Sequence, residues 1–366
     1  MERAATPAVK AGEYSRFDTV IDARTPAEYA EDHIPGAISA PVLGDAERAE
    51  VGTLYKQVSP FEAKKVGASL VSRNVSRHIE GLFKDKDRSW RPLVYCWRGG
   101  KRSGAMAHIL REVGWDAHTL EGGYKAYRRW VVQQLQQIPE QLKFEIIHGP
   151  TGSGKSRFLG ALHEAGAQVL DLEALAEHRG SVLGGLPGRP QPSQKMFESR
   201  LLQQLNQFDF HERVFVEGES KKIGELQVPD ALMQRMRGSP CVALEAALET
   251  RVELLLEEYR HFLGDRAALE AQLDCLVALH GKQKIGAWKA LAQRGQWREF
   301  VARLLAEHYD PAYRRSSVRN FPGLATARVV RIGSPCPEAF RAAAAALRGE
   351  IPDVGPGPNR ANSLRP

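Results

Sequence analysis

Residues 143–156 read KFEIIHGPTGSGKS, an apolar run followed by a glycine-rich turn, a lysine and a serine. The run predicts a buried β-strand, and Gly149 to Ser156 fit the pattern G-x-x-x-x-G-K-S/T, which leads into a helix. Glycines let backbone N–H groups wrap a phosphate at a helix N-terminus, while Lys155 supplies a positive charge and Ser156 a ligand for Mg²⁺. The predicted phosphate-binding residues are Gly149, Thr151, Gly152, Ser153, Gly154, Lys155 and Ser156.

Strand-like runs alternate with helix-like stretches on both sides of this loop. Upstream they are FDTVIDAR (17–24), RPLVYCW (91–97) and WDAHTLEGG (115–123). Downstream they are AQVLDL (167–172), RVFVEGES (213–220), CVALEA (241–246) and ARVVRI (327–332). Such alternation predicts an α/β fold with parallel sheets that are covered by helices.

The length of 366 residues indicates two domains. A helix is expected at about Tyr127 to Gln137 and should end before Pro139, which disfavours helix in the residue before it. We therefore predict one domain over 12–137 and a second over 140–350, with a helical insertion at about 249–315. The tail 351–366, rich in Pro, Gly and Asn, is expected to be disordered.

A second distinctive loop runs from Cys96 to Ser103, CWRGGKRS, between the strand RPLVY and a helix that begins SGAMAHIL. The helix N-terminus and the basic side chains of the loop should lower the pKa of the thiol. The other cysteines are Cys241, Cys275 and Cys336; no pair has C-x-x-C spacing, so a structural zinc site is not expected. The predicted catalytic residue is Cys96, within a chalcogen- or anion-binding loop of Trp97, Arg98, Gly99, Gly100, Lys101 and Arg102.

Further short motifs flank this loop in the sequence: Asp22-Ala-Arg24, Glu28-Tyr29, His33 to Ala37 and Glu121 to Tyr124. Through them, residues 15 to 130 resemble the rhodanese family. This resemblance implies that Cys96 carries a chalcogen, and that Asp22, Arg24 and His33 fix turns and salt bridges. The loop from Cys96 to Arg102 is one residue longer than usual in that family and has the C-x5-R size of dual-specificity phosphatases. Phosphatase chemistry therefore stays open, although Tyr95 replaces the usual His and the loop has no Asp.

The two loops together resemble the tRNA 2-selenouridine synthase family. YCWRGGKRS (95–103), GPTGSGKS (149–156), DLEALAEHRGSVLG (171–184), QPSQKMFE (191–198) and VEGES (216–220) carry this resemblance. It implies that selenium replaces sulfur at the 2-position of the wobble uridine in tRNAs for Lys, Glu and Gln. Selenophosphate would supply selenium, carried as a selenosulfide on Cys96, after geranyl diphosphate held at the phosphate loop has alkylated the sulfur.

Further candidate residues are less specific. Asp171 and Glu217 end apolar strands, a position that suits a ligand of Mg²⁺ or water and a solvent-facing acid equally well. Residues 280–320 are rich in Lys and Arg with interleaved Trp and Tyr, which suits either a tRNA surface or an ordinary helical face; Lys282, Lys284, Arg314 and Arg315 are the candidate contacts. The Gly- and Pro-rich segment from Arg179 to Gln194 suggests a substrate loop or a surface loop.

Composition adds broad limits. A net charge of +7 suits an anionic partner such as RNA, without requiring one. No apolar run is long enough to span a bilayer and the N-terminus lacks a secretory signal, so we expect a cytoplasmic monomer that needs no tightly bound cofactor. The alternative function is a P-loop ATP-dependent sulfurtransferase or kinase with a rhodanese domain that supplies sulfur.

Overall fold

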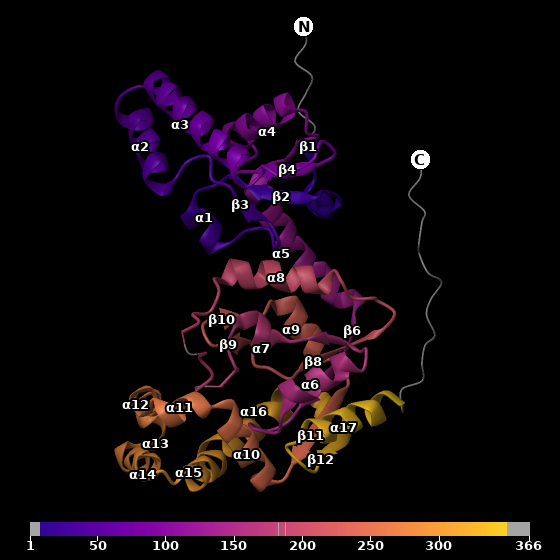
Figure 1. Ribbon diagram of the computed structural model, residues 1–366. Helices are drawn as coiled ribbons and strands as arrows, with labels where there is room; N and C mark the ends of the chain where they lie inside the picture. Colours follow the sequence, from indigo (N-terminus) through magenta and orange to yellow (C-terminus); the bar gives the residue numbers. More distant parts are fainter. Residues whose placement is uncertain (1–7, 182, 187, 350–366) are drawn as a thin grey trace. The chain divides into compact units, whose positions relative to one another are not determined.

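The computed structural model describes residues 8–181, 183–186 and 188–349 (Figure 1). The expected disordered tail, 351–366, lies outside these residues. The chain forms two compact units. Unit 1 contains the residues up to Leu135 together with Pro192–Gln203, and unit 2 contains Gln136–Gln191 together with the residues from Gln204 onward.

Unit 1 is built on a parallel five-stranded sheet with the strand order β1-β5-β4-β2-β3. The strands are β1 (Ala8–Val9), β2 (Thr19–Asp22), β3 (Ile38–Ser39), β4 (Pro92–Tyr95) and β5 (His118–Leu120). Every residue of the central strand β4 is buried, as expected for a parallel strand covered on both faces. The loop that follows β4 therefore starts from the middle of the sheet.

Helices complete unit 1. They are the short helix Ala11–Arg16, α1 (Pro26–Glu31), α2 (Asp45–Gln57), α3 (Pro60–Glu80), α4 (Lys101–Val113), most of α5 (Gly123–Gln141) and most of α8 (Gln194–Leu205). The core beneath α3 and α4 includes Phe83, Trp90, Met106 and Trp115. The pair α2–α3, which lies side by side in Figure 1, was not predicted from the sequence.

Helix α5 differs from the prediction. It runs from Gly123 to Gln141 and contains Pro139, whereas the sequence predicted a helix that ended before this proline. Proline removes one backbone hydrogen bond from a helix. Pro139 lies in the last turn of α5, so the helix has only two further residues after it. The expectation that Pro139 ends the helix was therefore wrong.

Unit 2 has a second parallel five-stranded sheet, with the order β12-β11-β6-β8-β7. Its strands are β6 (Lys143–His148), β7 (Gln168–Leu170), β8 (Arg213–Glu217), β11 (Cys241–Ala246) and β12 (Arg328–Ile332). A small antiparallel pair, β9 (Lys222–Ile223) and β10 (Leu226–Gln227), follows β8. The predicted α/β class with parallel sheets is confirmed, and β6 is again the central strand.

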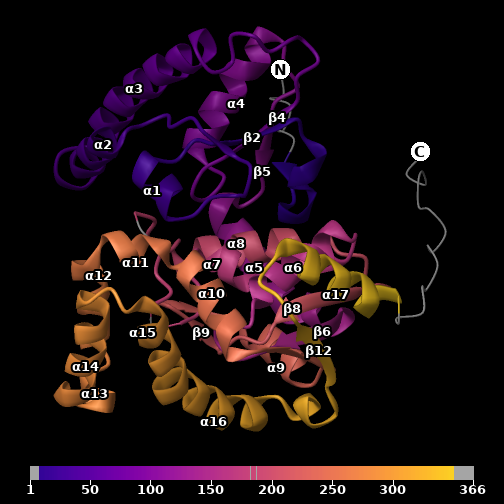
Figure 2. The same cartoon turned by 60° about the horizontal axis from the view of Figure 1, so that its bottom comes forward.

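The helices α6 (Lys155–Glu164), α7 (Leu172–Ala176), α9 (Asp230–Arg237) and α17 (Pro337–Gly349) accompany this sheet. Figures 1 and 2 both show α6 and α17 side by side, and Phe158, Leu162, Phe340 and Leu347 join their core. This packing holds α6 against the sheet and so determines where the N-terminus of α6 lies.

Only helices lie between β11 and β12 in the described chain (Figure 2). They are α10 (Leu248–Glu258), α11 (Arg260–Gly264), α12 (Arg266–Asp274), α13 (Val277–His280), α14 (Lys282–Gln293), α15 (Trp297–Leu304), a wide turn over Leu305–Tyr309, α16 (Asp310–Asn320) and a short helix over Pro322–Thr326. Leu269, Leu273, Trp288 and Phe300 belong to a core of their own. This segment is called the helical insertion below.

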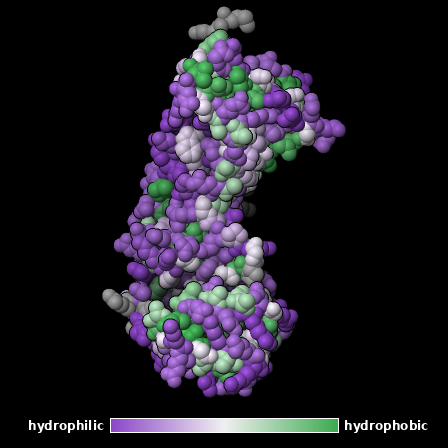
Figure 3. All heavy atoms as spheres, turned by 90° about the vertical axis from the view of Figure 1, so that its left-hand side faces the viewer, coloured by the Kyte–Doolittle hydropathy of each residue, from purple (hydrophilic) through white to green (hydrophobic). Residues whose placement is uncertain are grey.

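The face drawn in Figure 3 is mainly hydrophilic, with apolar residues in small groups. None of the helices in the described part of the chain combines the length and the apolar character needed to cross a membrane.

Candidate functional site

Cys96 lies at the carboxyl end of β4, and its loop leads directly into α4. The thiol is buried, with 4% of the residue exposed, and the Ser103 hydroxyl donates a hydrogen bond to Sγ over 3.2 Å. Burial alone raises the pKa of Cys96. Hydrogen bonds from the Ser103 hydroxyl and from the N–H groups of Ser103 and Gly100, with the charge of Arg102, outweigh burial, so the pKa is lowered. The thiolate is thus favoured, as a nucleophile requires.

The cysteine loop rests on the start of α5. The N–H groups of Tyr124 and Lys125 donate to the carbonyl oxygens of Cys96 and Trp97, over 2.8 and 3.0 Å. A Cβ at Gly123 would lie 2.2 Å from the Cys96 carbonyl oxygen and 2.3 Å from the Gly99 nitrogen. Only glycine permits this approach, so Gly123 determines where the loop, and with it the thiol, is held.

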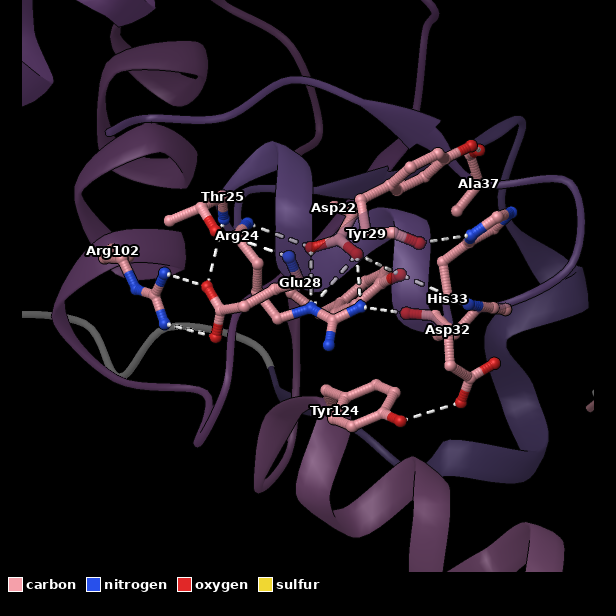
Figure 4. A network of polar contacts seen from close by, with 12 residues as sticks. Asp22, Arg24, Thr25, Glu28, Tyr29, Asp32, His33, Ala37, Arg102 and Tyr124 are labelled. Atoms are coloured by element: carbon pink, nitrogen blue, oxygen red, sulfur yellow. Dashed lines mark hydrogen bonds and ion pairs between the residues drawn. The ribbon is translucent and has the colours of Figure 1, made fainter. Parts of the chain in front are cut away.

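Arg102 of the cysteine loop is held by Glu28 (Figure 4). Its guanidinium donates to both Glu28 carboxylate oxygens, over 2.8 and 3.4 Å. Burial raises the pKa of Glu28, but the hydrogen bonds from Arg102 and from the Thr25 N–H outweigh it and keep that pKa below its usual value. Glu28 also caps α1 together with Thr25, so the first turn of that helix orients Arg102. Arg98 and Lys101 of the same loop are exposed.

Hydrogen bonds link the residues upstream of the cysteine loop that carry the rhodanese resemblance. Arg24 donates to both carboxylate oxygens of Asp22 and to the carbonyl oxygen of Asp32 (Figure 4). His33 Nδ1 lies 2.9 Å from the Tyr29 carbonyl oxygen, and the two rings stack. These contacts fix the segment around α1 and match the turn-fixing role expected of Asp22, Arg24 and His33.

The phosphate loop connects the central strand β6 of unit 2 to α6. Gly152 and Gly154 have φ of +79° and +82°, values that favour glycine. A Cβ at Gly154 would lie 2.6 Å from the Phe340 ring, so α17 also excludes a larger residue there. Lys155 Nζ donates to the Gly149 carbonyl oxygen over 3.1 Å, which folds its ammonium back over the loop.

The helical insertion holds the phosphate loop in place. Arg251 of α10 donates from Nε and Nη2 to the Thr151 carbonyl oxygen, over 3.0 and 2.8 Å. Its guanidinium also forms a bidentate ion pair with Asp310, over 2.6 and 3.1 Å. Arg251 is buried, so this pair is little exposed to screening by solvent. No sequence motif pointed to Arg251, because its partners lie far along the chain.

Four carboxylic acids gather beside Lys155 and Ser156: Asp171, Glu173, Glu217 and Glu219. Ser156 Oγ donates to Glu173 Oε2 over 3.1 Å, and the Glu173 N–H donates to Glu217 Oε1 over 2.8 Å. Asp171 accepts a bond from the Ala174 N–H and caps α7. Asp171 and Glu217 were predicted as candidates, whereas Glu173 and Glu219 were missed although they stand in quoted stretches.

Burial dominates the ionisation of these acids. It raises the pKa of Glu173 to about 8, with a further contribution from the Glu219 charge. The pKa of Glu217, which is 2% exposed, is raised well above its usual value by burial and by Asp171 and Glu173. One oxygen of Glu217, Oε2, has no hydrogen-bond partner among the described residues. The ionised forms of these acids are therefore disfavoured in the folded protein, and a cation bound beside them would stabilise the carboxylates.

The donor set suits Mg²⁺, which prefers hard oxygen ligands and often binds through one or two carboxylates together with substrate phosphates. In the described residues no three His, Cys, Asp or Glu side chains are placed to hold a metal ion by themselves. A metal at Ser156, Glu173 and Glu217 would thus depend on phosphate oxygens for its other ligands.

A cavity of about 650 Å³ opens over the phosphate loop. It is lined by the phosphate loop, by three of the carboxylic acids (Asp171, Glu173 and Glu219), by the segment Arg179–Ser181 and by Tyr259 of the helical insertion. Arg179 donates to the Glu258 carbonyl oxygen over 2.7 Å, and Ser181 Oγ lies 3.2 Å from Tyr259 Oη. The start of the Gly- and Pro-rich segment therefore forms one wall of the cavity.

A second cavity, of about 50 Å³, is almost wholly apolar. Leu256, Phe300, Val301 and Leu305 are among its lining residues. It shares Thr151, Leu255, Tyr259 and Tyr309 with the larger cavity. An apolar site thus lies next to an anion site, a combination that the sequence did not reveal.

The sequence left two interpretations of the basic stretch 280–320 open, a tRNA surface and an ordinary helical face, and the position of Trp288 favours the second. Trp288 is 1% exposed and packs in the core of the helical insertion, so it is not available to stack on a base. Several of its cations are paired with acids: Lys284 with Glu307, Lys289 with Asp274, Arg298 with Glu253, and Arg303 with Glu299. This segment is therefore a packed and partly neutralised helical layer.

Comparisons with known proteins agree on both units. The family model of the rhodanese-like domain matches residues 8–129, and that of the tRNA 2-selenouridine synthase AAA domain matches residues 142–274. A tRNA 2-selenouridine synthase from Sulfurovum sp. is 34% identical over 82% of this chain and 89% of its own length. One from Nitrosomonas europaea is 39% identical over 66% of this chain, and the match spans only 63% of that protein.

Among solved structures, the N-terminal domain of a putative ATP/GTP binding protein from Clostridium difficile 630 is 39% identical, with a TM-score of 0.30. The match covers 34% of this chain and 98% of that domain.

Replacing Gly123 by Ala should displace the cysteine loop, because the new Cβ would meet the Cys96 carbonyl oxygen. We expect the pKa of the thiol to rise and its alkylation by iodoacetamide at neutral pH to slow by about tenfold or more, since each unit of pKa is a tenfold change in thiolate. The pH profile of Cys96 alkylation measures this. Gly104→Ala in α4 is the control, because its Cβ meets no atom within 4 Å; equal profiles for the two variants would contradict the role of Gly123.

The carboxylate cluster should make unit 2 less stable as pH rises. The folded pKa of Glu173, about 8, lies above its unfolded value of 4.5, so the folded state holds a proton that the unfolded state loses across this range. We expect the midpoint temperature of thermal unfolding, measured without Mg²⁺, to decrease as the pH is raised from about 4.5 to about 8. Glu173→Gln should flatten this slope and Glu212→Gln, at an exposed position, should not. An unchanged slope in Glu173→Gln would exclude Glu173 as its cause.

Proposed function

The chain belongs to the tRNA 2-selenouridine synthase family, and we propose that it exchanges sulfur for selenium in the 2-thiouridine at the wobble position of tRNAs for Lys, Glu and Gln. The observation that carries the proposal is the presence, in one chain, of a thiol with lowered pKa at the N-terminus of α4 and a phosphate loop bordered by an apolar cavity. We expect the protein to act in the cytoplasm, with selenophosphate as the selenium donor.

The first proposed step is geranylation of the thiouridine sulfur. The sulfur attacks the first carbon of geranyl diphosphate, a carbon–sulfur bond forms, and the carbon–oxygen bond breaks to release diphosphate. Alkylation turns a thiocarbonyl sulfur, which is a poor leaving group, into one that departs as geranylthiol. Selenium at the selenide level, supplied by selenophosphate, then attacks C2 of the base. A carbon–selenium bond forms and the carbon–sulfur bond breaks, so that geranylthiol leaves without net oxidation or reduction of carbon.

The two cavities of unit 2 support geranyl diphosphate as the ligand. Lys155, Ser156 and the loop N–H groups offer charge and donors to a diphosphate. The apolar cavity beside them, of about 50 Å³, accommodates only the end of a hydrocarbon chain, so the rest of the geranyl group would lie in the larger cavity. The small cavity offers almost no polar surface, which suits the end of a hydrocarbon chain better than a ribose or a base.

Mg²⁺ is the metal we propose for this step. Ser156 with Glu173 or Glu217 would hold it, and the ion would supply charge to the departing diphosphate. Lys155 and Arg179 line the same cavity and add positive charge around the anion. Arg251 keeps the loop backbone in place through the Thr151 carbonyl oxygen.

For the tRNA we propose contacts from Lys282, Lys284, Arg314 and Arg315. Lys282 and Arg315 are exposed, and both carry charge that can meet backbone phosphates. Lys284 lies 3.5 Å from Glu307, and Arg314 donates to the Asp310 carbonyl oxygen, so these two retain only part of their donor capacity for RNA. Charge, rather than stacking by Trp288, is the basis of the proposed contact.

Single substitutions should separate the two steps. Incubated with 2-thiouridine tRNA, geranyl diphosphate and selenophosphate, Cys96→Ala should give S-geranyl-2-thiouridine and no 2-selenouridine. Lys155→Ala should lower geranylation by roughly a hundredfold or more, because a charge that stabilises the leaving diphosphate is lost. Mass analysis of the wobble nucleoside measures both products. Selenouridine formed at the normal rate by Cys96→Ala would overturn the proposed role of this residue.

A substitution that fills the apolar cavity should selectively weaken the binding of geranyl diphosphate. Val301→Phe adds a ring to the wall of this cavity and should raise KM for geranyl diphosphate by about tenfold, equivalent to about 1.4 kcal/mol. Selenium transfer to tRNA that is already geranylated should be unchanged. Val329→Phe, at an exposed position of β12, is the matched control. Equal KM values for both variants would argue against a hydrocarbon tail in this cavity.

A further inference from the structure

We propose that Cys96 accepts the phosphoryl group of selenophosphate, not its selenium, and thereby releases hydrogen selenide. This inference deepens the proposed function and rests on it. The Cys96 thiolate attacks phosphorus, a sulfur–phosphorus bond forms, the phosphorus–selenium bond breaks, and its electron pair leaves with HSe⁻. Water then hydrolyses S-phosphocysteine to phosphate and the free thiol.

The spacing and contacts of the loop support a phosphoryl acceptor. Cys96 and Arg102 enclose five residues, and Ser103 follows directly, a C-x5-R-S arrangement that suits a tetrahedral phosphoryl group above the thiolate. The N–H groups of Gly100 and Ser103 already point at Sγ, and α4 adds its N-terminal dipole. An arginine has five donors, so the pair with Glu28 leaves others for phosphoryl oxygens.

Electron balance favours phosphorus as the point of attack. Selenium in selenophosphate is at the oxidation level of selenide, and so is the selenium that enters the carbon–selenium double bond. A selenosulfide on Cys96 contains selenium that is two electrons more oxidised, so this carrier needs an oxidant to form and a reductant to release it. Attack on phosphorus needs neither, and HSe⁻ can displace geranylthiol from C2 directly.

The proposed leaving group needs no general acid. A phosphate ester leaves as an alkoxide and needs an acid to protonate it, whereas hydrogen selenide is a far stronger acid than an alcohol and HSe⁻ leaves without protonation. The loop Cys96 to Arg102 has no carboxylic acid. Ser103 acts in the second half of the reaction, because its hydroxyl donates to Sγ over 3.2 Å and stabilises the thiolate when S-phosphocysteine is hydrolysed.

Two labels on selenophosphate distinguish the carriers. The full-length protein is incubated, in the absence of tRNA, with selenophosphate that is labelled either on phosphorus or on selenium. The protein is then denatured, and the label bound to the peptide that contains Cys96 is measured. We expect the phosphorus label, and no selenium label, on wild type and none on Cys96→Ala. Ser103→Ala should hydrolyse the adduct roughly tenfold to a hundredfold more slowly and accumulate it, because a hydrogen bond to the departing thiolate is lost. Cys336→Ala, at an exposed cysteine, should label like wild type.

Selenium label on Cys96 without phosphorus label would overturn the inference in favour of a selenosulfide. So would the lack of phosphorus label in both wild type and Ser103→Ala, if wild type converts geranylated tRNA to selenouridine in the same preparation. If wild type makes no selenouridine from geranylated tRNA and selenophosphate, the proposed function itself fails, whatever the labels report.

A bypass provides an independent measurement. If Cys96 serves only to release selenide, Cys96→Ala supplied with hydrogen selenide in place of selenophosphate should form selenouridine from geranylated tRNA above the rate without protein. Failure of this rescue, under conditions in which wild type uses the same selenide, would contradict the inference.

Discussion

Backbone N–H groups at a helix N-terminus, presented at the end of a central parallel strand, are the feature on which both candidate sites depend. In unit 1 the strand is β4 and the helix α4; in unit 2 they are β6 and α6. Each strand is the middle one of five, so its carboxyl end opens at the centre of the sheet edge. The side chains differ between the two loops, with a thiol in one and an ammonium in the other. Each is added to an anion site of the same kind, which is formed by backbone N–H groups at a helix N-terminus.

The sequence predicted the elements that depend on neighbours along the chain. Strand, glycine turn and helix follow one another within a few residues, so the phosphate loop and the cysteine loop could both be located. Arg251 and Asp310 could not, because their ion pair joins helices 59 residues apart. The sequence also left open whether the aromatic residues of 280–320 face solvent or a core, because this depends on the packing of the whole helical insertion; Trp288 lies in the core. Pro139 lies inside α5 because a helix can tolerate one missing hydrogen bond near its end.

The ionised carboxylates of unit 2 destabilise the folded protein in the absence of a ligand. Burial raises the pKa of Asp171, Glu173, Glu217 and Glu219, so each ionised form is disfavoured in the folded protein. Such an arrangement gains from a cation, and a cation beside Lys155 gains from phosphate oxygens. The folded protein therefore holds these acids and Lys155 in an arrangement that is stabilised when a phosphate anion binds together with a cation. Ionisable groups with such shifted pKa values are typical of functional sites.

The chemistry of the two units can be derived from their leaving groups. In the proposed reactions a diphosphate leaves from carbon in unit 2 and selenide leaves from phosphorus in unit 1, and each loop would stabilise an anionic phosphate. Selenide attacks C2 productively only when the sulfur there can depart, and the alkyl group provides this. In the proposed scheme alkylation therefore precedes selenium transfer. Because Cys96 is buried, HSe⁻ that leaves phosphorus there would form in the cysteine loop and not in bulk solvent.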